Sequence, residues 1–363
     1  MNKTTPTKID AASAWLLEQL RVADPSMQKL WLADENTLSL TDDKAAQKTN
    51  LKVITNRFDV AHRLQQQSFK VQLSDFDFAD IDNNSLDQVY YRISKEKPVV
   101  YHLFNESFTK LKLGGRLLIC GKKNEGVKTY FSKLKKMWKG DALLTKQGDN
   151  YVGYVVKQSD VAGEVFDTKD YHSLRPVAEI PSRNEINALT IHSKPGLFGW
   201  NKIDQGSAFL TEHLQALIDS RDKPCDSVLD LGCGYGYLSL MLKAFPITRR
   251  VATDNNTAAV LAATENFKRN QVEVDVKLDD CAANIDETFD LIVCNPPFHQ
   301  GFSIDGDLTD KFLRNTRTHM NKGACALFVV NQFIPLERKA GELFNKVSQL
   351  ANNGSFKLVL LET

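Results

Sequence analysis

The segment Asn295-Pro296-Pro297-Phe298 (the NPPF motif) carries groups suited to binding an amino group. Two consecutive prolines fix φ and remove two N–H donors, which leaves backbone carbonyls free to accept hydrogen bonds. The side-chain oxygen of Asn295 and the carbonyl of Pro296 could hold both N–H bonds of a planar amino group on a base, and Phe298 could stack on that base. The lone pair would then face a methyl donor, so catalysis would be mostly orientation.

A rigid turn is the simplest interpretation of such a proline pair in an arbitrary loop. This pair directly follows the apolar run FDLIVC, and a glycine-rich loop lies upstream of it. In that context we interpret the four residues of the NPPF motif as catalytic.

The glycine-rich loop runs from Asp230 to Gly236 and follows the apolar run SVLDL. Gly232, Gly234 and Gly236 let the backbone turn tightly and let a ligand approach where a Cβ would clash. Their G-x-G-x-G spacing, with Cys233 inside it, differs from the G-x-G-x-x-G of dinucleotide-binding loops. Asp230 would repel a pyrophosphate but could accept from a ligand ammonium or brace the loop, so the pattern favours S-adenosylmethionine over a dinucleotide.

Carboxylates also end the next two strand candidates. Asp254 comes 18 residues after Gly236 and could accept from both hydroxyls of a ribose, although dinucleotide enzymes place an acid in the same role. Asp279 and Asp280 end the third strand candidate, where a carboxylate could receive the adenine amino group. We favour Asp280, since one of the two acids could simply cap a turn.

Short apolar runs alternate with amphipathic stretches through the C-terminal half. Strands are expected at 227–231, 249–253, 273–278, 289–294 and 325–330, with helices at 236–245, 257–269 and 307–320. This alternation predicts a mostly parallel sheet with helices on both faces, in which a bound ligand lies at the carboxyl ends of the strands. Asn353-Gly354 between two alternating runs predicts a terminal hairpin, so an antiparallel strand should close the sheet.

The N-terminal half repeats this pattern more weakly. Residues 88–98 resemble 289–298 as a strand followed by a proline turn, and 111–126 resemble 320–335 as a helix end, a glycine turn and a buried strand. Residues 29–40 stand where a first strand and its loop would be, but they contain no glycine. Strand–turn patterns are common enough to arise by coincidence, yet we favour a degenerate copy of the C-terminal fold.

The balance of 46 basic and 45 acidic residues gives a net charge of +1, which by itself argues against a polyanionic partner. Residues 158–183 form the best linker candidate, with two prolines and no sustained apolar period. Cutting at 175 leaves 27 basic and 22 acidic residues before the cut and 19 and 23 after it, so the halves carry about +5 and −4. The N-terminal half is therefore the basic one.

Most of that excess lies in residues 110–139, which hold ten basic residues and one acid, Glu125. A solvated helix face would explain many charge runs, but this imbalance also fits a surface that contacts phosphates. The candidate RNA-binding lysines are Lys122, Lys123, Lys128, Lys133, Lys135 and Lys136.

The composition, 42% hydrophobic and 25% charged, is typical of a globular protein and excludes a long disordered chain or a fibre. None of the six cysteines forms a C-x-x-C pair, so we expect buried, reduced thiols in a cytoplasmic protein. The first ten residues do not resemble a secretory signal, and no apolar run is long enough to span a membrane. We expect no metal and no membrane partner.

LDLGCGYG together with NPPF resembles the class I methyltransferases that act on exocyclic or amide nitrogens. PGLFGWNKIDQGSAFL (195–210), then DLGCGYG, then NPPFHQG resemble the RsmC family, bacterial guanine-N2 methyltransferases of small-subunit rRNA, in order and spacing. YYRISKEKP and KLGGRLLICGKKNEGVK resemble the N-terminal domain of that family. The resemblance is strong over 190–335 and weak over 1–80.

The resemblance implies two tandem Rossmann-like methyltransferase domains, with a degenerate one at 1–170 and a catalytic one at 171–363. Only the second would bind S-adenosylmethionine, while the first would support RNA binding and folding. The implied reaction is methylation of a guanine N2 of 16S rRNA, in the assembled 30S subunit, by a monomer.

The resemblance also assigns individual residues. The implied catalytic residues are Asn295, Pro296, Pro297 and Phe298, and the implied cofactor-binding residues are Phe198, Asp204, Gly206, Asp230, Gly232, Cys233, Gly234, Gly236, Asp254, Asp280 and Asn295. Phe198, Asp204 and Gly206 match a motif, F-x-x-x-x-x-D-x-G, that lies against the methionine end of the cofactor. Trp200 and Asn201 depart from the Ser-Arg of many relatives. His299 could touch the base or a phosphate, or could be an ordinary loop histidine.

Other functions remain open at this point. The related 23S rRNA guanine-N2 enzymes share two domains and NPPFH, although the N-terminal segments favour the 16S reaction. Methylation of DNA adenine or of a protein glutamine also uses N-P-P-[FY], but the chain lacks a DNA target-recognition insertion. A non-catalytic ribosome-assembly factor would not need an intact NPPF motif and glycine loop in one domain.

Overall fold

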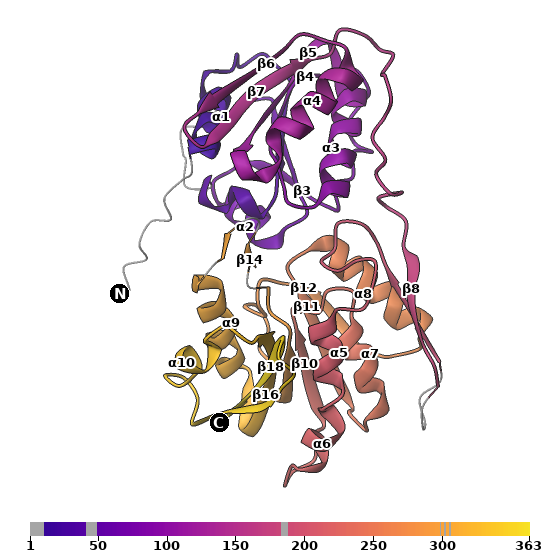
Figure 1. Cartoon of the computed structure of the whole chain (residues 1–363), viewed down its shortest axis with the longest axis vertical. Helices are drawn as coiled ribbons and strands as arrows, with labels where there is room; N and C mark the ends of the chain where they lie inside the picture. The colour runs from indigo at the N-terminus through magenta and orange to yellow at the C-terminus, as the bar shows by residue number, and fades with distance from the viewer. Residues whose placement is uncertain (1–10, 41–48, 183–187, 298, 301–302, 305) are drawn as a thin grey trace. The chain divides into compact units, whose positions relative to one another are not determined.

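The chain divides into two compact units, Met1–Tyr171 (unit 1) and His172–Thr363 (unit 2). The computed structural model describes residues 11–40, 49–182, 188–297, 299–300, 303–304 and 306–363 (Figure 1). Each unit is an α/β domain built on a sheet of seven strands.

The sheet of unit 1 has the strand order β3-β2-β1-β4-β5-β7-β6. Its strands are β1 (Lys29–Ala33), β2 (Leu51–Thr55), β3 (Lys70–Leu73), β4 (Leu86–Arg92), β5 (Leu111–Lys122), β6 (Ala142–Gln147) and β7 (Asn150–Val156). The first five strands in this order are parallel, and β7 pairs antiparallel with both β5 and β6. Unit 1 is therefore a parallel sheet closed by an antiparallel hairpin.

The sheet of unit 2 has the same order, β12-β11-β10-β13-β16-β18-β17. Its strands are β10 (Ser227–Leu231), β11 (Arg249–Asp254), β12 (Asp275–Leu278), β13 (Phe289–Cys294), β16 (Met320–Asn331), β17 (Lys346–Asn352) and β18 (Phe356–Glu362). The β17–β18 hairpin confirms the antiparallel end predicted from Asn353-Gly354, and Gly354 has a φ of 86° in its turn. The predicted strands all exist, and β16 is twice as long as expected.

Helices cover both faces of the unit 1 sheet because successive residues of the buried strand β1 point to opposite sides. Leu30 and Leu32 pack in one apolar cluster with α3 (Lys97–Lys110) and α4 (Val127–Trp138). Trp31 and Ala33 pack in another with α1 (Ala11–Val22) and α2 (Phe58–Gln66). Both faces of the strand are thus removed from water.

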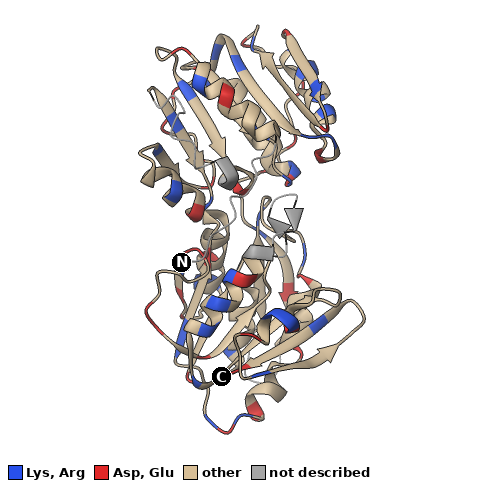
Figure 2. Cartoon of the chain, turned by 90° about the vertical axis from the view of Figure 1, so that its left-hand side faces the viewer, with Lys and Arg blue, Asp and Glu red and all other residues tan. Residues whose placement is uncertain are grey.

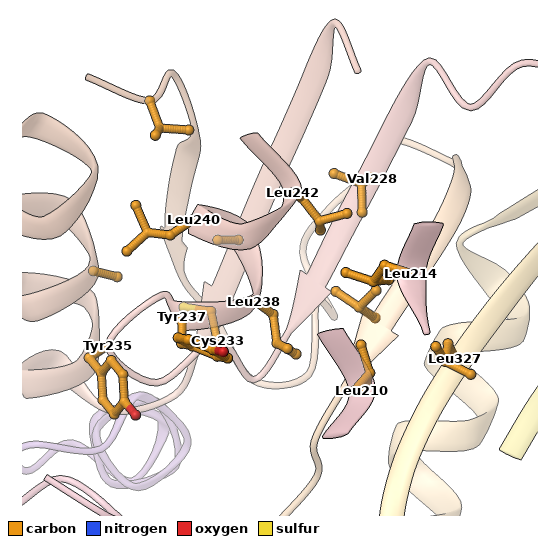
Figure 3. Close-up of a cluster of buried hydrophobic side chains, with 14 of the residues drawn as sticks. Leu210, Leu214, Val228, Cys233, Tyr235, Tyr237, Leu238, Leu240, Leu242 and Leu327 are labelled. Carbon is orange, nitrogen blue, oxygen red and sulfur yellow. The ribbon is translucent and has the colours of Figure 1, made fainter. Parts of the chain in front are cut away.

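Unit 2 is covered in the same way. The helices α5 (Gln205–Thr211), α6 (Leu214–Asp219), α7 (Tyr237–Met241) and α8 (Thr257–Arg269) contribute to one apolar cluster, part of which is drawn in Figure 3. The helices α9 (Gly306–Thr318) and α10 (Leu336–Ala340) contribute to the other. Among the described residues, no helix has the length and apolar character needed to cross a membrane. All six cysteines are buried and unbridged, as predicted.

The two sheets also share one irregularity of register. In unit 1, Leu86 pairs with Leu111 and Gln88 with Arg116; in unit 2, Phe289 pairs with Met320 and Leu291 with Cys325. In each case a step of two positions on one strand matches a step of five on its partner, and a glycine of positive φ, Gly114 or Gly323, lies in the bulge. A bulge shared at the same point is a detail that coincidence does not explain, and it supports the predicted duplication. The sequence interpretation differs in one respect, because β5 and β16 begin before the glycines rather than after them.

The first part of the predicted linker, residues 158–171, packs along α3 of unit 1. The side chain of Asn105 donates from Nδ2 to the Phe166 carbonyl (2.9 Å) and accepts from the Phe166 N–H (3.1 Å). The Phe166 ring stacks on Tyr101 with 4.7 Å between ring centroids. This contact fixes both the backbone and the side chain of Phe166.

The rest of the predicted linker is also structured. The Tyr171 hydroxyl donates to Asp75 (2.7 Å), and its ring stacks on His102. Beyond it, β8 (Arg175–Ile180) pairs antiparallel with β9 (Leu189–Ser193) in unit 2. The boundary between the units falls inside 158–183, but most of that stretch belongs to one unit or the other.

Two asparagines of α8 complete the edge of β9. Asn266 donates from Nδ2 to the carbonyls of His192 (2.7 Å) and Tyr235 (2.8 Å), and its Oδ1 accepts from the His192 N–H (2.8 Å). Asn270 makes the matching pair of bonds to Thr190 (3.0 Å each). Because Tyr235 lies in the glycine loop, Asn266 ties that loop to the segment that leads into α5.

Replacing Asn266 by Ala should lower the free energy of unfolding by about 2–4 kcal/mol, because backbone groups of His192 and Tyr235 lose their buried partner. Urea denaturation of the full chain, followed by circular dichroism, measures the change. Lys268→Ala on the exposed side of the same helix is the control and should stay within about 0.5 kcal/mol of the parent. Equal effects of the two variants would show that Asn266 does not hold this edge.

Candidate functional site

The glycine loop leaves β10 at the carboxyl edge of the unit 2 sheet. Gly232, Gly234 and Gly236 have φ values of 78°, 57° and 86°, which favour glycine. A Cβ on Gly236 would lie 2.6 Å from the Phe267 ring of α8, whereas a Cβ on Gly234 would meet nothing within 4 Å. Packing thus requires the glycine at 236, and the space beside Gly234 is open.

Three loop amides are bound to the end of β11. The N–H groups of Gly232 (2.9 Å) and Cys233 (2.8 Å) both donate to the Thr253 carbonyl, and that of Gly234 donates to Oδ2 of Asp254 (2.9 Å). A loop that binds phosphate needs such amides for its ligand. This loop therefore offers a ligand shape and side chains rather than a cradle of N–H groups.

Asp230 is a fully buried carboxylate at the end of β10. Its Oδ2 accepts from the backbone N–H (3.0 Å) and the hydroxyl (2.7 Å) of Ser239. Its Oδ1 is buried and has no hydrogen-bond partner among the described residues. Burial raises the pKa of Asp230 to about 7, against the lowering effect of the Ser239 bonds. A buried acceptor that no described residue binds fits a ligand that brings a positive charge, as the ammonium and sulfonium of S-adenosylmethionine would.

Asp254 lies at the end of β11 with both carboxylate oxygens oriented by backbone donors. Gly234 donates to Oδ2, and the N–H of Asn256 donates to Oδ1 (2.8 Å). A carboxylate oxygen can accept more than one hydrogen bond, so a carboxylate at this strand end is of the right type to accept from two adjacent hydroxyls. Its geometry suits the predicted contact to a ribose.

The two acids after β12 have different environments. Asp279 is buried and accepts from the backbone N–H (3.0 Å) and the side chain (3.4 Å) of Asn284, so it caps the following turn. Asp280 forms an ion pair with Lys311 of α9. The structure thus assigns the turn-capping role, which the sequence left open, to Asp279.

Asn295 follows β13 and is held through its amide nitrogen. Its Nδ2 donates to Oδ1 of Asp204 (2.7 Å) and to Oγ of Ser207 (2.9 Å). Both N–H bonds of the amide are therefore used within the protein, and no donor to Oδ1 is found among the described residues, so this oxygen can accept. Pro296 is buried and Pro297 exposed, as a motif at the surface of the sheet edge requires. Phe298 lies outside the described residues, and His299 begins the short strand β14 (His299–Gln300), paired with β15 (Ser303–Ile304).

The segment before α5 brings Asp204, but not Phe198, to Asn295. Asp204 is the N-cap of α5 and accepts from the Ser207 N–H (2.9 Å). A Cβ on Gly206 would lie 3.1 Å from Oδ1 of Asp204, so glycine allows this close turn. The Phe198 side chain is 76% exposed. Sequence reasoning missed Ser207 and Asn266, and the only signal for Ser207 was its place directly after the D-x-G motif.

Unit 1 carries different residues at the corresponding positions. The shared bulge aligns Gln88 with Leu291, and strand pairing carries that alignment across the two sheets. In this register Trp31 corresponds to Asp230, Ala33 to Gly232, Glu35 to Gly234, Thr55 to Asp254 and Arg92 to Asn295. The acids and glycines of the unit 2 edge are thus replaced at every one of these positions.

Arg92 of unit 1 forms a buried ion pair with Glu125. Its guanidinium contacts both carboxylate oxygens of Glu125, at 2.5 and 2.8 Å, and both side chains are almost completely buried. Glu125 also accepts from the Lys122 N–H (2.6 Å). A Cβ on Gly121 would lie within 3.0 Å of this pair, so no room is left beside it. The position that Asn295 occupies in unit 2 is thus taken in unit 1 by an arginine in a buried salt bridge.

All six lysines predicted to contact RNA are exposed residues of unit 1. Figure 2 colours the basic and acidic residues along the ribbon. Lys128, Lys135 and Lys136 lie on the solvent side of α4, opposite the buried Phe131 and Leu134. Lys122 and Lys123 precede that helix. Lys133 differs, because its ammonium donates to the Tyr101 hydroxyl (2.6 Å).

Family models match both units of the chain. The model of the methyltransferase small domain matches residues 188–360, and that of the N-terminal part of methyltransferase small domain proteins matches 26–142. Together they cover the five parallel strands of the unit 1 sheet and all of the unit 2 sheet except the end of β18.

Curated relatives share this arrangement over most of their length. Ribosomal RNA small subunit methyltransferase C of Erwinia tasmaniensis is 29% identical over 274 residues, 75% of this chain and 74% of its own. The protein of that name in Haemophilus influenzae is 25% identical over 315 residues, 86% of this chain and 88% of its own.

A solved structure, the 16S rRNA N2 methyltransferase (RsmC) of T. thermophilus in complex with AdoMet and guanosine, matches with a TM-score of 0.77. The alignment covers 98% of this chain and 92% of that one at 21% identity, so the likeness extends over both domains of the fold. The carboxylates and glycine loop of unit 2, the matching family models and the relatives agree: the chain belongs to the RsmC family of S-adenosylmethionine-dependent methyltransferases.

Proposed function

We propose that this chain transfers a methyl group from S-adenosylmethionine to the exocyclic N2 of a guanine in 16S rRNA, within the assembled 30S subunit. The observation that carries the proposal is the amide of Asn295, whose nitrogen is bound by Asp204 and Ser207 so that its oxygen is left to accept. An amino group is the substrate that needs such an acceptor. The relatives named for small-subunit rRNA support the choice of RNA.

The side chains of the site orient the amino group rather than deprotonate it. S-adenosylmethionine supplies an electrophilic methyl group when bound. Asn295 Oδ1 accepts one N–H of the guanine amino group and the Pro296 carbonyl accepts the other, which directs the nitrogen lone pair toward the methyl carbon. Both oxygens stabilise the positive charge that develops on nitrogen, so its proton can leave after transfer. Phe298 stacks on the guanine.

The cofactor is held by residues of four segments at the same edge. Asp230 accepts from the cation of the methionine part, Gly232, Cys233, Gly234 and Gly236 shape the loop, and Asp254 accepts from the ribose hydroxyls. Asp280 would contact the adenine, and Asp204 and Gly206 would lie against the methionine end. Phe198, which is exposed, would have to turn inward to join them.

Unit 1, over residues 1–170, binds RNA and supports folding without binding a cofactor. The replacements of Asp230 by Trp31 and of Asp254 by Thr55 in the shared register support the loss of the cofactor. Exposed lysines of α4, with Lys122, Lys123 and His299, would contact RNA phosphates. Because the N2 of a paired guanine faces the minor groove, the target base must be unpaired or flipped out of its helix.

The test is methyl transfer from labelled S-adenosylmethionine to purified 30S subunits, 50S subunits, naked 16S rRNA and DNA, followed by mapping of the labelled nucleotide. Label on one guanine N2 of 16S rRNA, strongest in 30S particles, is expected. Label confined to 50S particles would identify a 23S enzyme, and label in DNA or protein a different substrate class. An absence of label from every substrate would leave a non-catalytic assembly factor as the remaining function.

Asn295→Ala should reduce turnover at least 100-fold, because the amino group loses the acceptor that orients it. The dissociation constant of S-adenosylmethionine, measured by calorimetry, should change less than threefold. Retention of more than a tenth of the parent turnover would rule out this role for Asn295.

Cofactor affinity should rise with pH up to about 7 and then level off. The free protein holds Asp230 partly protonated because burial raises its pKa to about 7, and a cationic ligand binds the ionised form. Each pH unit below 7 should therefore weaken binding by up to tenfold, with release of a proton on binding. Asp230→Asn should bind S-adenosylmethionine weakly and with an affinity that does not change with pH. Asp254→Asn should also bind the cofactor weakly, but its affinity should still rise with pH. A pH-independent affinity in the parent protein would contradict the role of Asp230.

The lysines of α4 should control the salt dependence of RNA binding. The double variant Lys128→Ala/Lys135→Ala removes two exposed cations, so the slope of log K against log salt should fall by roughly 1.4–1.8, with cofactor affinity unchanged. Filter binding to 16S rRNA fragments between 50 and 200 mM salt, on the order of physiological ionic strength, measures the slope. Lys268→Ala in unit 2 is the control, and equal slopes for all three proteins would remove α4 from the RNA surface.

A further inference from the structure

We infer that Asp204 and Ser207 are positioning residues that fix which end of the Asn295 amide faces the substrate. This inference rests on the proposed transfer to an amino nitrogen, and it assigns Asp204 a second role besides contact with the cofactor. Neither residue needs to touch the guanine for this role.

The orientation of the amide decides whether the site can bind an amino group at all. An asparagine side chain carries an acceptor and two donors that exchange places when the end group rotates by half a turn. With Nδ2 toward Asp204, Asn295 offers an oxygen to the guanine amino group. With the end group reversed, it would offer N–H bonds to N–H bonds and repel the substrate.

Asp204 selects the first orientation because a carboxylate only accepts. Its Oδ1 lies 2.7 Å from Nδ2 of Asn295, so a reversed amide would bring two oxygens to that distance with no proton between them. Ser207 gives the second N–H bond an acceptor at 2.9 Å. The two contacts hold both N–H bonds of the amide and prevent its rotation.

The positioning residues are themselves fixed by the start of α5. Oδ1 of Asp204 accepts from the Ser207 N–H (2.9 Å) as the cap of that helix, so both acceptors move as one group. The Cα of Gly206 lies so close that an added Cβ would be 3.1 Å from Asp204 and 3.2 Å from the Phe356 ring of β18. Glycine at 206 therefore allows the chain to pass close to Asp204 at the start of the helix.

A reciprocal exchange of charge tests the inference. In Asn295→Asp, a carboxylate oxygen could still accept from the substrate, but the new carboxylate would lie against that of Asp204. Turnover should fall by about 1,000-fold or more, because the reacting amino group is no longer oriented. Asp204→Asn keeps an oxygen acceptor for the amide and for the helix cap but weakens the proposed cofactor contact, so its turnover, measured at saturating S-adenosylmethionine, should lie well above that of Asn295→Asp. The double variant Asn295→Asp/Asp204→Asn can place the new amide nitrogen at 204 against the new carboxylate at 295 only by giving up the oxygen that accepts from the Ser207 N–H, so a partial recovery of roughly tenfold over Asn295→Asp is expected.

Ser207→Ala provides a second measurement that does not depend on the acidic variant folding. Loss of one of the two acceptors should lower kcat about threefold to tenfold while KM for RNA and the dissociation constant of S-adenosylmethionine stay within about twofold. Ser355→Ala in the exposed turn of the β17–β18 hairpin is the matched control and should leave kcat unchanged.

The outcomes separate this inference from the proposed function. Parent protein that labels no RNA would refute the function itself. Active parent protein overturns the inference if Asn295→Asp is as active as the parent, if the double variant recovers nothing over Asn295→Asp, if Asp204→Asn is as inactive as Asn295→Asp, or if Ser207→Ala has an unchanged kcat. Recovery in the double variant, with a kcat loss in Ser207→Ala, supports it.

Discussion

The carbonyl of Thr253 joins the two strand ends on which the site of unit 2 depends. It accepts from two successive amides of the glycine loop, and the next side chain, Asp254, accepts from a third. These bonds set the loop against β11 and use the donors that a phosphate would need. The loop is therefore rigid and selective in a way that G-x-G-x-G spacing alone does not convey. This arrangement suits a cationic ligand without phosphate groups, such as S-adenosylmethionine.

The two units show how one backbone can keep or lose a site. Strand order, helix placement and even a bulge are shared, so the fold does not depend on the residues at the carboxyl edge. Unit 2 keeps Asp230 buried with one oxygen unpaired, an arrangement that is unfavourable without a ligand. In the shared register, unit 1 has Trp31 there, and its Arg92 is neutralised by Glu125. A domain without a ligand requirement can replace such acids by apolar contacts and closed ion pairs.

The sequence was most informative where local pattern and backbone geometry agree. The strands of unit 2, its terminal hairpin and the glycine loop follow from apolar periodicity and turn residues, which are local properties. The long strands β5 and β16 were cut short because their bulges are set by a partner strand far away in sequence. Phe166 and Tyr171 looked like part of a linker, since nothing local indicates that Asn105 and Asp75 bind them. The motif that contains Phe198 likewise does not indicate that its side chain is exposed.

The orientation of Asn295 belongs to the same class of non-local properties, and it matters more for the chemistry than any element boundary. The NPPF motif supplies an asparagine and two donor-free residues, but it does not determine which end of the amide faces outward. That choice is made by Asp204, some ninety residues earlier, through a helix cap that Gly206 allows to approach. A capping carboxylate, whose usual role is to satisfy the first turn of a helix, therefore also sets the orientation of a side chain that follows a distant strand, β13. The motif can act as an acceptor only because the fold brings a second acceptor behind it.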